Sequence, residues 1–323
     1  MKTWQVHIII IFFVCFSCDN ESVERSFATP SSLDIPKLFE DNILAPVIPI
    51  DNPQTVEGIA LGKKLFFDPI LSIDNTLACV DCHAPENAFT DSDKFSDGVD
   101  GIFGNRNSMP LFNLAWNYDE KFFWDGNTFS LEHQAFVPVT DPFEMKSNWA
   151  DVESKLQQHA EYPSLFEKAF GASNIDSSLV TKAIAQFERT LISANSKFDK
   201  FLLGELNLSP EELNGFNVFM DEAKGDCFHC HGSDKNPLWT DNIFHNNGLD
   251  ETFADLGLGA VTGDPADNGK FKSPSLRNLE FTAPYMHDGR FKKLSQVLNH
   301  YSKGIEAVPN LAEQLKGGLE LTS

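Results

Sequence analysis

Two short stretches of the chain pair thiols with an imidazole that follows directly. Residues 79–83 read Cys-Val-Asp-Cys-His, and residues 227–231 read Cys-Phe-His-Cys-His. In such a motif both thiols can add across the vinyl groups of haem, and the adjacent histidine is then placed to ligate the iron. The sequence therefore predicts two covalently attached c-type haems, held by Cys79, Cys82 and His83 and by Cys227, Cys230 and His231.

Zinc or disulfide chemistry is the alternative for these thiols. Zinc ribbons usually bring their CxxC pairs within roughly 15–20 residues of one another, whereas these two motifs lie in different halves of the chain. Of the six cysteines, Cys15 and Cys18 lie in the N-terminal export segment or at its end, so no thiol remains for a structural disulfide. Haem attachment therefore accounts for the cysteines of the mature chain.

The N-terminal segment has the composition of an export signal. Residues 1–17 contain Lys2 and an apolar run over 6–16, which is too short to span a bilayer and predicts a signal peptide. Cys18 stands where a bacterial lipoprotein carries its acylated cysteine, so we expect a lipid anchor in preference to simple cleavage. Residues 18–36 are predicted to be a flexible tether. We expect a periplasmic lipoprotein that meets the membrane only through this anchor.

The rest of the chain is predicted to be all-α. With 323 residues and 41% hydrophobic content, it is long enough for two domains, which we place at 37–195 and 196–323. Apolar side chains recur at helical spacing in three segments, 151–158, 162–170 and 176–192. Ser209, Pro210 and Glu212 form the start signal of a further helix, predicted to run to about Glu222.

The formal net charge of −22 argues against some partners. A nucleic acid or an anionic membrane surface would be repelled, and a cationic redox protein would be attracted. The same charge also serves solubility, so it does not name a partner.

Blocks of sequence outside the haem motifs carry a family resemblance. The chain resembles the bacterial dihaem cytochrome c peroxidases and the related enzyme MauG over roughly residues 37–323. The matching blocks are NPQT (52–55), LGKKLFFDP (61–69), LS (71–72), RNS (106–108), FWDG (123–126), LEHQ (131–134), EM (144–145), PSLRN (274–278) and APYMHDG (283–289).

The resemblance implies two class I cytochrome c-like helical domains, each with one haem. In this family the N-terminal haem meets peroxide and the C-terminal haem receives electrons from a small c-type cytochrome or cupredoxin. His83 would then be the proximal ligand of the peroxide-reactive haem, and His231 that of the electron-transfer haem.

The resemblance also implies catalytic roles for three side chains. Trp124 matches the tryptophan that lies between the haems, although by residue type alone it would be a buried aromatic anchor. Glu144 matches the distal acid/base and Gln134 its neighbour over the same iron. Splitting peroxide requires a proton to move between its oxygens, which a carboxyl of raised pKa can do at neutral pH. Without the resemblance Glu144 would be a surface acid.

A calcium ion is implied at the domain interface. Asn107, Thr282 and Pro284 match its ligands, the last two through backbone carbonyls, and oxygen donors suit this hard cation. Without the resemblance Thr282 and Pro284 would be turn residues.

Two positions depart from the peroxidases that need reductive activation. Those enzymes carry a histidine seven residues before the Arg-Asn pair, where this chain has Val99, which cannot bind iron. The first haem is therefore expected to be open in the oxidised state. On the second haem their distal methionine is replaced by Tyr301, the residue type that MauG uses. Met286 is a rival ligand at a different offset, and a core role for Tyr301 is the other alternative.

Three functions follow in order of preference. The first is a peroxidase that reduces hydrogen peroxide to water without prior reduction. The second is a MauG-like enzyme that uses peroxide to oxidise side chains of a partner protein, and the third is a dihaem electron carrier without catalysis. Relatives usually continue beyond residues 319–323 with a helix that closes the second domain. That helix is missing from this sequence, so we expect either that the chain is a fragment or that its second domain is shortened.

Overall fold

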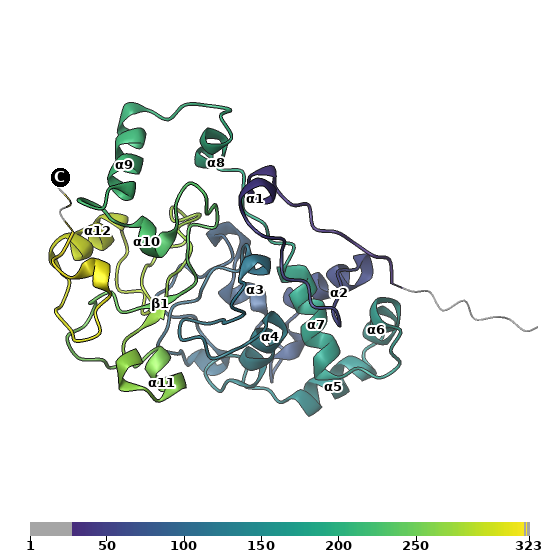
Figure 1. Ribbon diagram of the computed structural model, residues 1–323. Coiled ribbons are helices and arrows are strands. Elements are labelled where there is room, and N and C mark those ends of the chain that lie inside the picture. The colour runs from purple at the N-terminus through teal and green to yellow at the C-terminus, as the bar shows by residue number, and fades with distance from the viewer. Residues whose placement is uncertain (1–27, 320, 322–323) are drawn as a thin grey trace, which may run out of the picture.

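Helices joined by long irregular segments make up most of the fold (Figure 1). The structure is a computed structural model that describes residues 28–319 and residue 321. The predicted signal peptide and Cys18 lie outside the described residues. The α-helices are α1 Lys37–Asn42, α2 Val56–Phe66, α3 Cys79–Cys82, α4 Leu131–Thr140, α5 Trp149–Gln158, α6 Tyr162–Phe170, α7 Ser177–Glu188, α8 Lys197–Leu202, α9 Pro210–Met220, α10 Phe228–His231, α11 Leu258–Thr262 and α12 Leu294–Lys303.

The remaining regular structure is short. Two strands, β1 (Phe244–His245) and β2 (Phe271–Lys272), pair antiparallel as a small sheet in the second half of the chain. The prediction of a mainly helical protein is confirmed, with this small sheet as an addition that the sequence did not indicate. The 3-10 helices are η1 Pro69–Leu71, η2 Pro85–Asn87, η3 Val99–Gly101, η4 Leu114–Trp116, η5 Pro265–Asp267 and η6 Glu313–Leu315.

The first half is organised around the crossing of α2 and α7. A Cβ atom on Gly62 of α2 would lie 1.8 Å from the carbonyl oxygen of Ala183 in α7, so glycine allows the two backbones to approach closely. The largest hydrophobic cluster surrounds this crossing and draws side chains from α2, α4, α5, α6 and α7. Figure 1 shows α2, α5, α6 and α7 gathered on one side of the molecule.

Local sequence signals fix several helix ends. Helix α6 spans the predicted residues, and α9 begins at the predicted Ser209 cap, where Ser209 and Glu212 exchange hydrogen bonds of 3.2 and 2.8 Å. Helix α7 is shorter than predicted, since it ends at Glu188 and not at Ile192. Helix α9 ends at Met220, close to the predicted end.

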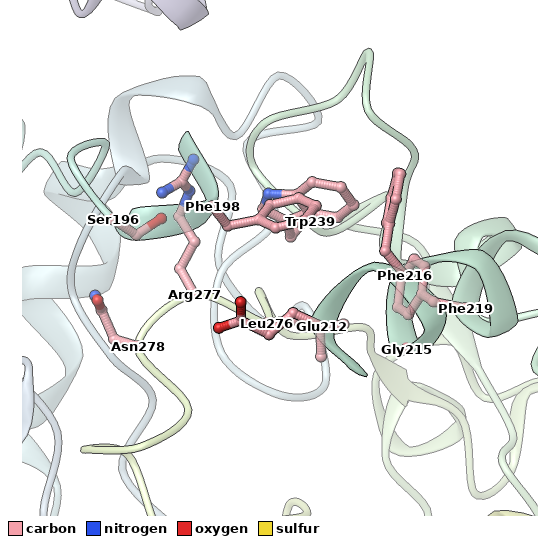
Figure 2. Close-up of a pocket in the computed structure, with 10 residues that line it drawn as sticks. All are labelled: Ser196, Phe198, Glu212, Gly215, Phe216, Phe219, Trp239, Leu276, Arg277 and Asn278. Carbon is pink, nitrogen blue, oxygen red and sulfur yellow. The ribbon is translucent and has the colours of Figure 1, made fainter. Parts of the chain in front are cut away.

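The second half contains α8–α12 and more irregular backbone. Its segments are tied together by a buried ion pair, in which the guanidinium of Arg277 donates to both carboxylate oxygens of Asp199 at 2.9 and 2.6 Å. Beside this pair, Phe198, Phe216 and Trp239 form the aromatic wall of a pocket of about 380 Å³ between α8 and α9 (Figure 2).

Residues 28–36 correct the predicted extent of the tether. The backbone N–H of Thr29 donates to Glu57 at 2.7 Å, and that of Ser31 donates to the carbonyl of Gln54 at 2.9 Å. Leu33 packs on the cluster around Phe39. The tether therefore does not extend over these residues, because their backbone groups find partners on α2 and the turn before it.

None of the helices in the described part of the chain is long and apolar enough to cross a membrane.

Candidate haem sites

The two CxxCH motifs form matching structures. Their cysteines lie on or beside the short helices α3 and α10, and the histidine of each motif has its ring fixed by a backbone carbonyl. His83 Nδ1 lies 3.0 Å from the oxygen of Phe89, and His231 Nδ1 lies 3.2 Å from the oxygen of Pro274. A bond at Nδ1 leaves Nε2 as the ligating atom, as in most metal-bound histidines.

Burial favours the neutral form of both histidines. It lowers the pKa of His83, and it lowers the pKa of His231 to about 4. Neutral imidazole is the form that binds a metal. Burial also raises the pKa of the Cys79 thiol. It raises the pKa of the Cys82 thiol to about 12. Both shifts disfavour the thiolates that zinc would need. The donor set therefore fits haem better than zinc.

The first cavity brings together His83 and the predicted catalytic pair. It measures about 50 Å³ and is lined by Gln134 and Glu144 as well as by the first CxxCH motif. Gln134 Oε1 and Glu188 Oε2, which also face this cavity, are buried without a hydrogen-bond partner. Buried polar atoms are rarely left unpaired, so these two atoms mark where a polar molecule such as a substrate can bind in the cavity.

Glu144 has the properties of a proton carrier. Its side chain is exposed to solvent and also lines the cavity. Burial raises the pKa of Glu144 to about 7, and the like charge of Asp141 contributes in the same direction. A carboxyl with this pKa can both accept and release a proton near neutral pH. Met145, the next residue, packs into the main core cluster.

The second cavity, of about 370 Å³, contains both candidate ligands of the second iron. Leu294, Val297, Leu298 and Tyr301 of α12 all line it, as their spacing predicted. Met286 lines it too, on a backbone with φ of 73°.

Tyr301 and Met286 share one neighbour that sequence reasoning missed. The side-chain amide of Asn247 donates to Tyr301 Oη at 3.3 Å and lies 3.6 Å from Met286 Sδ. No motif around Asn247 indicated this position, because it depends on the loop after β1 folding against α12.

Trp124 lies between the two halves of the chain. It lines the second cavity, and its indole N–H donates to the carbonyl of Asn107 at 2.8 Å. Its own carbonyl accepts from the backbone N–H of Lys272 on β2 at 2.9 Å. Both bonds hold the ring in a fixed place beside the second haem site.

The three predicted calcium ligands, Asn107, Thr282 and Pro284, are all among the residues that line the second cavity. The amide nitrogen of Asn107 donates to the carbonyls of Asp93 and Lys94 at 3.1 and 3.3 Å, which leaves its oxygen free of these two bonds. This oxygen-rich set fits a hard cation such as calcium.

A second cluster near this cavity is explained by the haem motif. Cys230, Asp241 and His245 bring potential ligand atoms within 4.8 Å of one another. His245 Nε2 lies 2.7 Å from Asp241 Oδ2. Burial lowers the pKa of His245, but hydrogen bonds to Asp241 and Cys230 outweigh burial and raise this pKa to about 10. Because Cys230 becomes a thioether on haem attachment, the cluster loses its best metal ligand.

Comparison with known proteins places these sites in a family. A family model described as di-haem cytochrome c peroxidase matches residues 56–207. The methylamine utilization protein MauG of Methylophilus methylotrophus is 38% identical over 256 residues, which cover 78% of this chain and 74% of that protein. The cytochrome c551 peroxidase of Nitrosomonas europaea is 35% identical over 260 residues, 78% of this chain and 75% of that protein.

A solved structure agrees with the sequence comparisons. The crystal structure of a MauG-like protein associated with microbial copper homeostasis superposes with a TM-score of 0.78 at 34% identity. The alignment covers 88% of this chain and 87% of the other.

Proposed function

The chain belongs to the di-haem cytochrome c peroxidase family, which includes MauG, and on this premise we propose that it reduces hydrogen peroxide to water with electrons from a small redox protein. It is an oxidoreductase that acts on peroxide. The observation that carries the proposal is the joint presence of His83, Gln134 and Glu144 around one cavity.

The residues around the first cavity have separate roles in the proposed cleavage of peroxide. Haem held by Cys79, Cys82 and His83 would supply an iron that exchanges electrons with peroxide. His83 is held as a neutral ligand by the carbonyl of Phe89. Glu144, as carboxylate, accepts a proton from one oxygen of peroxide and delivers it to the other oxygen. The oxygen that receives the proton can then leave as water. Gln134 orients the substrate from the same wall.

We propose that the first site is ready for peroxide without prior reduction. Val99, at the position where activation-dependent relatives carry a blocking histidine, is buried, and its backbone N–H donates to the carbonyl of Glu144 at 2.9 Å. Among the described residues that line the first cavity, His83 is the sole histidine. Both observations favour an open position opposite His83.

Electrons are proposed to reach the first site from the second haem by way of Trp124, which its two hydrogen bonds fix beside the second cavity. Tyr301 is the proposed sixth ligand of the second haem iron, and Met286 is the alternative.

Asn107, Thr282 and Pro284 are proposed to bind calcium at the second cavity. The donor is proposed to be a cationic c-type cytochrome or cupredoxin, since the chain carries −22 charges.

The finer organisation of the chain is part of the proposal. Residues 37–195 are proposed to form the peroxide-reactive haem domain, and residues 196–323 the electron-transfer haem domain. The protein is proposed to be periplasmic and anchored through a lipid on Cys18.

The second candidate is a MauG-like oxidation of a partner protein. Tyr301 in the second cavity favours it, since a tyrosinate ligand stabilises ferric iron and suits chemistry shared by two oxidised haems. Two relatives named MauG are 38% and 37% identical to this chain over 78% and 92% of its length.

One experiment separates the two candidates. The fully oxidised, haem-loaded protein is mixed with peroxide and a reduced small cytochrome c, without prior reduction. Sustained donor oxidation supports the peroxidase. Fast reaction with one equivalent of peroxide followed by a stall supports the second candidate, and a requirement for prior reduction would refute the open first site.

A further inference from the structure

Glu188, the last residue of α7, is a buried acid that the proposed mechanism does not use. It is 3% exposed and lines the first cavity together with Glu144 and Gln134. Its Oε2 is enclosed, and no group in the described part of the chain donates a hydrogen bond to either carboxyl oxygen. An ionised carboxylate in this position would be strongly destabilised, because it has lost water and gained no donor.

The neighbouring charges do not neutralise it. Arg189 follows directly in the chain, but its guanidinium donates to Glu132 Oε1 on α4 at 2.8 Å, and both partners are largely buried. Glu132 thus cancels most of the attraction that Arg189 exerts on Glu188. Burial raises the pKa of Glu188 to about 8, with Arg189 opposing the shift and Glu132 adding to it. The fourth charged group near this cavity, Glu144, is itself an acid of raised pKa.

The position of Glu188 argues against a role in binding haem carboxylates. Glu188 and Cys79 line the same small cavity, and the charge of Glu188 contributes to raising the pKa of the Cys79 thiol. The cysteines bind haem at its vinyl groups, whereas the propionates occupy the opposite edge of the porphyrin. A carboxyl beside Cys79 is therefore remote from the propionates, and it faces the cavity in which peroxide is cleaved.

We propose that Glu188 is a second catalytic acid of the first haem site, which stores a proton and delivers it to the second water formed from peroxide. The inference deepens the proposed function and rests on it. Glu144 only moves a proton between the two oxygens of peroxide, so the first water leaves without net proton uptake. The remaining oxygen atom requires two electrons, supplied by the donor protein, and two protons to leave as water.

Glu188 supplies one of these two protons. Its O–H bond breaks, an O–H bond of the product water forms, and the resulting carboxylate takes a proton from solvent before the next cycle. The second proton comes from solvent through the open side at Glu144. Because the acid is neutral while it waits, its burial carries little cost until the proton leaves.

The test compares Glu188→Gln with the haem-loaded wild-type protein by infrared spectroscopy and by rapid mixing. Gln has the same shape and cannot release a proton. Glu167→Gln, which changes an exposed acid on α6, is the matched control. Because Glu144 is itself partly protonated at pH 7, the infrared spectra are compared in a Glu144→Gln background. There we expect a carboxylic acid C=O band that shifts in D₂O and that Glu188→Gln removes.

Rapid mixing separates the two stages of the reaction. Peroxide consumption by the oxidised protein should stay within about twofold in Glu188→Gln, whereas return to the resting state on adding reduced donor should slow by at least about tenfold. The solvent isotope effect on that second stage should change as well. Glu188→Asp, which keeps an acid on a shorter side chain, should restore part of the rate and covers the case that the Gln variant does not fold.

The outcomes are distinct. If Glu188→Gln removes no carboxylic acid band in the Glu144→Gln background, Glu188 is ionised and the inference is overturned. If Glu188→Gln loses the band but keeps the wild-type rates of peroxide consumption and of return to the resting state, Glu188 is not the proton donor. If the wild-type protein does not consume peroxide, the proposed function itself fails, and the band then reports only on the protonation of Glu188.

Discussion

Glu144 gives the most direct quantitative prediction, because its role depends on its protonation state. It must be ionised to accept a proton from peroxide, and burial raises its pKa to about 7. About 9% of the protein would then be active at pH 6 and about 90% at pH 8, so the rate of peroxide consumption should rise about tenfold between these values. A carboxyl of the ordinary pKa, 4.5, would already be about 97% ionised at pH 6 and would give an almost flat profile.

The assay is rapid mixing of the oxidised, haem-loaded protein with peroxide between pH 5 and pH 9. Glu144→Gln should lower the rate constant by roughly 10²–10⁴ and remove the rise with pH, because the amide accepts no proton. Asp141→Asn is the companion variant. It removes the like charge that helps to raise the pKa of Glu144, so its profile should keep the same plateau and shift its midpoint to lower pH.

Two results would refute this reasoning. A flat wild-type profile between pH 6 and pH 8 would mean that the carboxyl is not perturbed or does not take the proton. A Glu144→Gln variant that keeps the wild-type rate and an intact haem content would remove Glu144 from the mechanism.

Three further predictions concern ligation and stability. Tyr301→Phe should change the absorption spectrum of the second haem and raise its reduction potential, and an identical spectrum would show that the ligand lies elsewhere. Asp199→Asn leaves the charge of Arg277 buried without its partner, so urea titration should show a loss of about 3–5 kcal/mol, and a loss below about 1 kcal/mol would contradict the buried pair. Gly62→Ala forces a methyl group against the backbone of α7 and should cost at least about 1–3 kcal/mol by the same titration. Gly215→Ala, in open space on α9, should be neutral or slightly stabilising.

Local signals allowed the sequence to predict much of the helical framework. The cap at Ser209 and the apolar spacing over 162–170 depend only on neighbouring residues, and both predictions hold in the structure. The end of α7 was placed too late, because the apolar pattern continues through Leu191 while the hydrogen-bonded helix stops at Glu188. The strands β1 and β2 are too short to produce an alternating pattern.

The haem-binding residues could be predicted because CxxCH is a contiguous motif. The roles of Glu144, Gln134 and Tyr301 came only from the family resemblance, since each is an ordinary residue type in its local context. The structure brings each of them to a haem cavity. Glu188 and Asn247 were missed, because their environments depend on contacts between segments distant in the chain, which no local pattern records.

The partners of the two haem-binding histidines differ in a way that bears on how the protein matures. The carbonyl that orients His83 belongs to Phe89, six residues further along the chain, whereas the carbonyl that orients His231 belongs to Pro274, 43 residues further. A short loop closes at a lower entropic cost than a long one, and it closes sooner. The first haem can therefore be received with its ligand already aligned while the chain is still emerging. The second must wait until the distal segment has been synthesised and folded back, so the order of haem insertion follows the order of the chain.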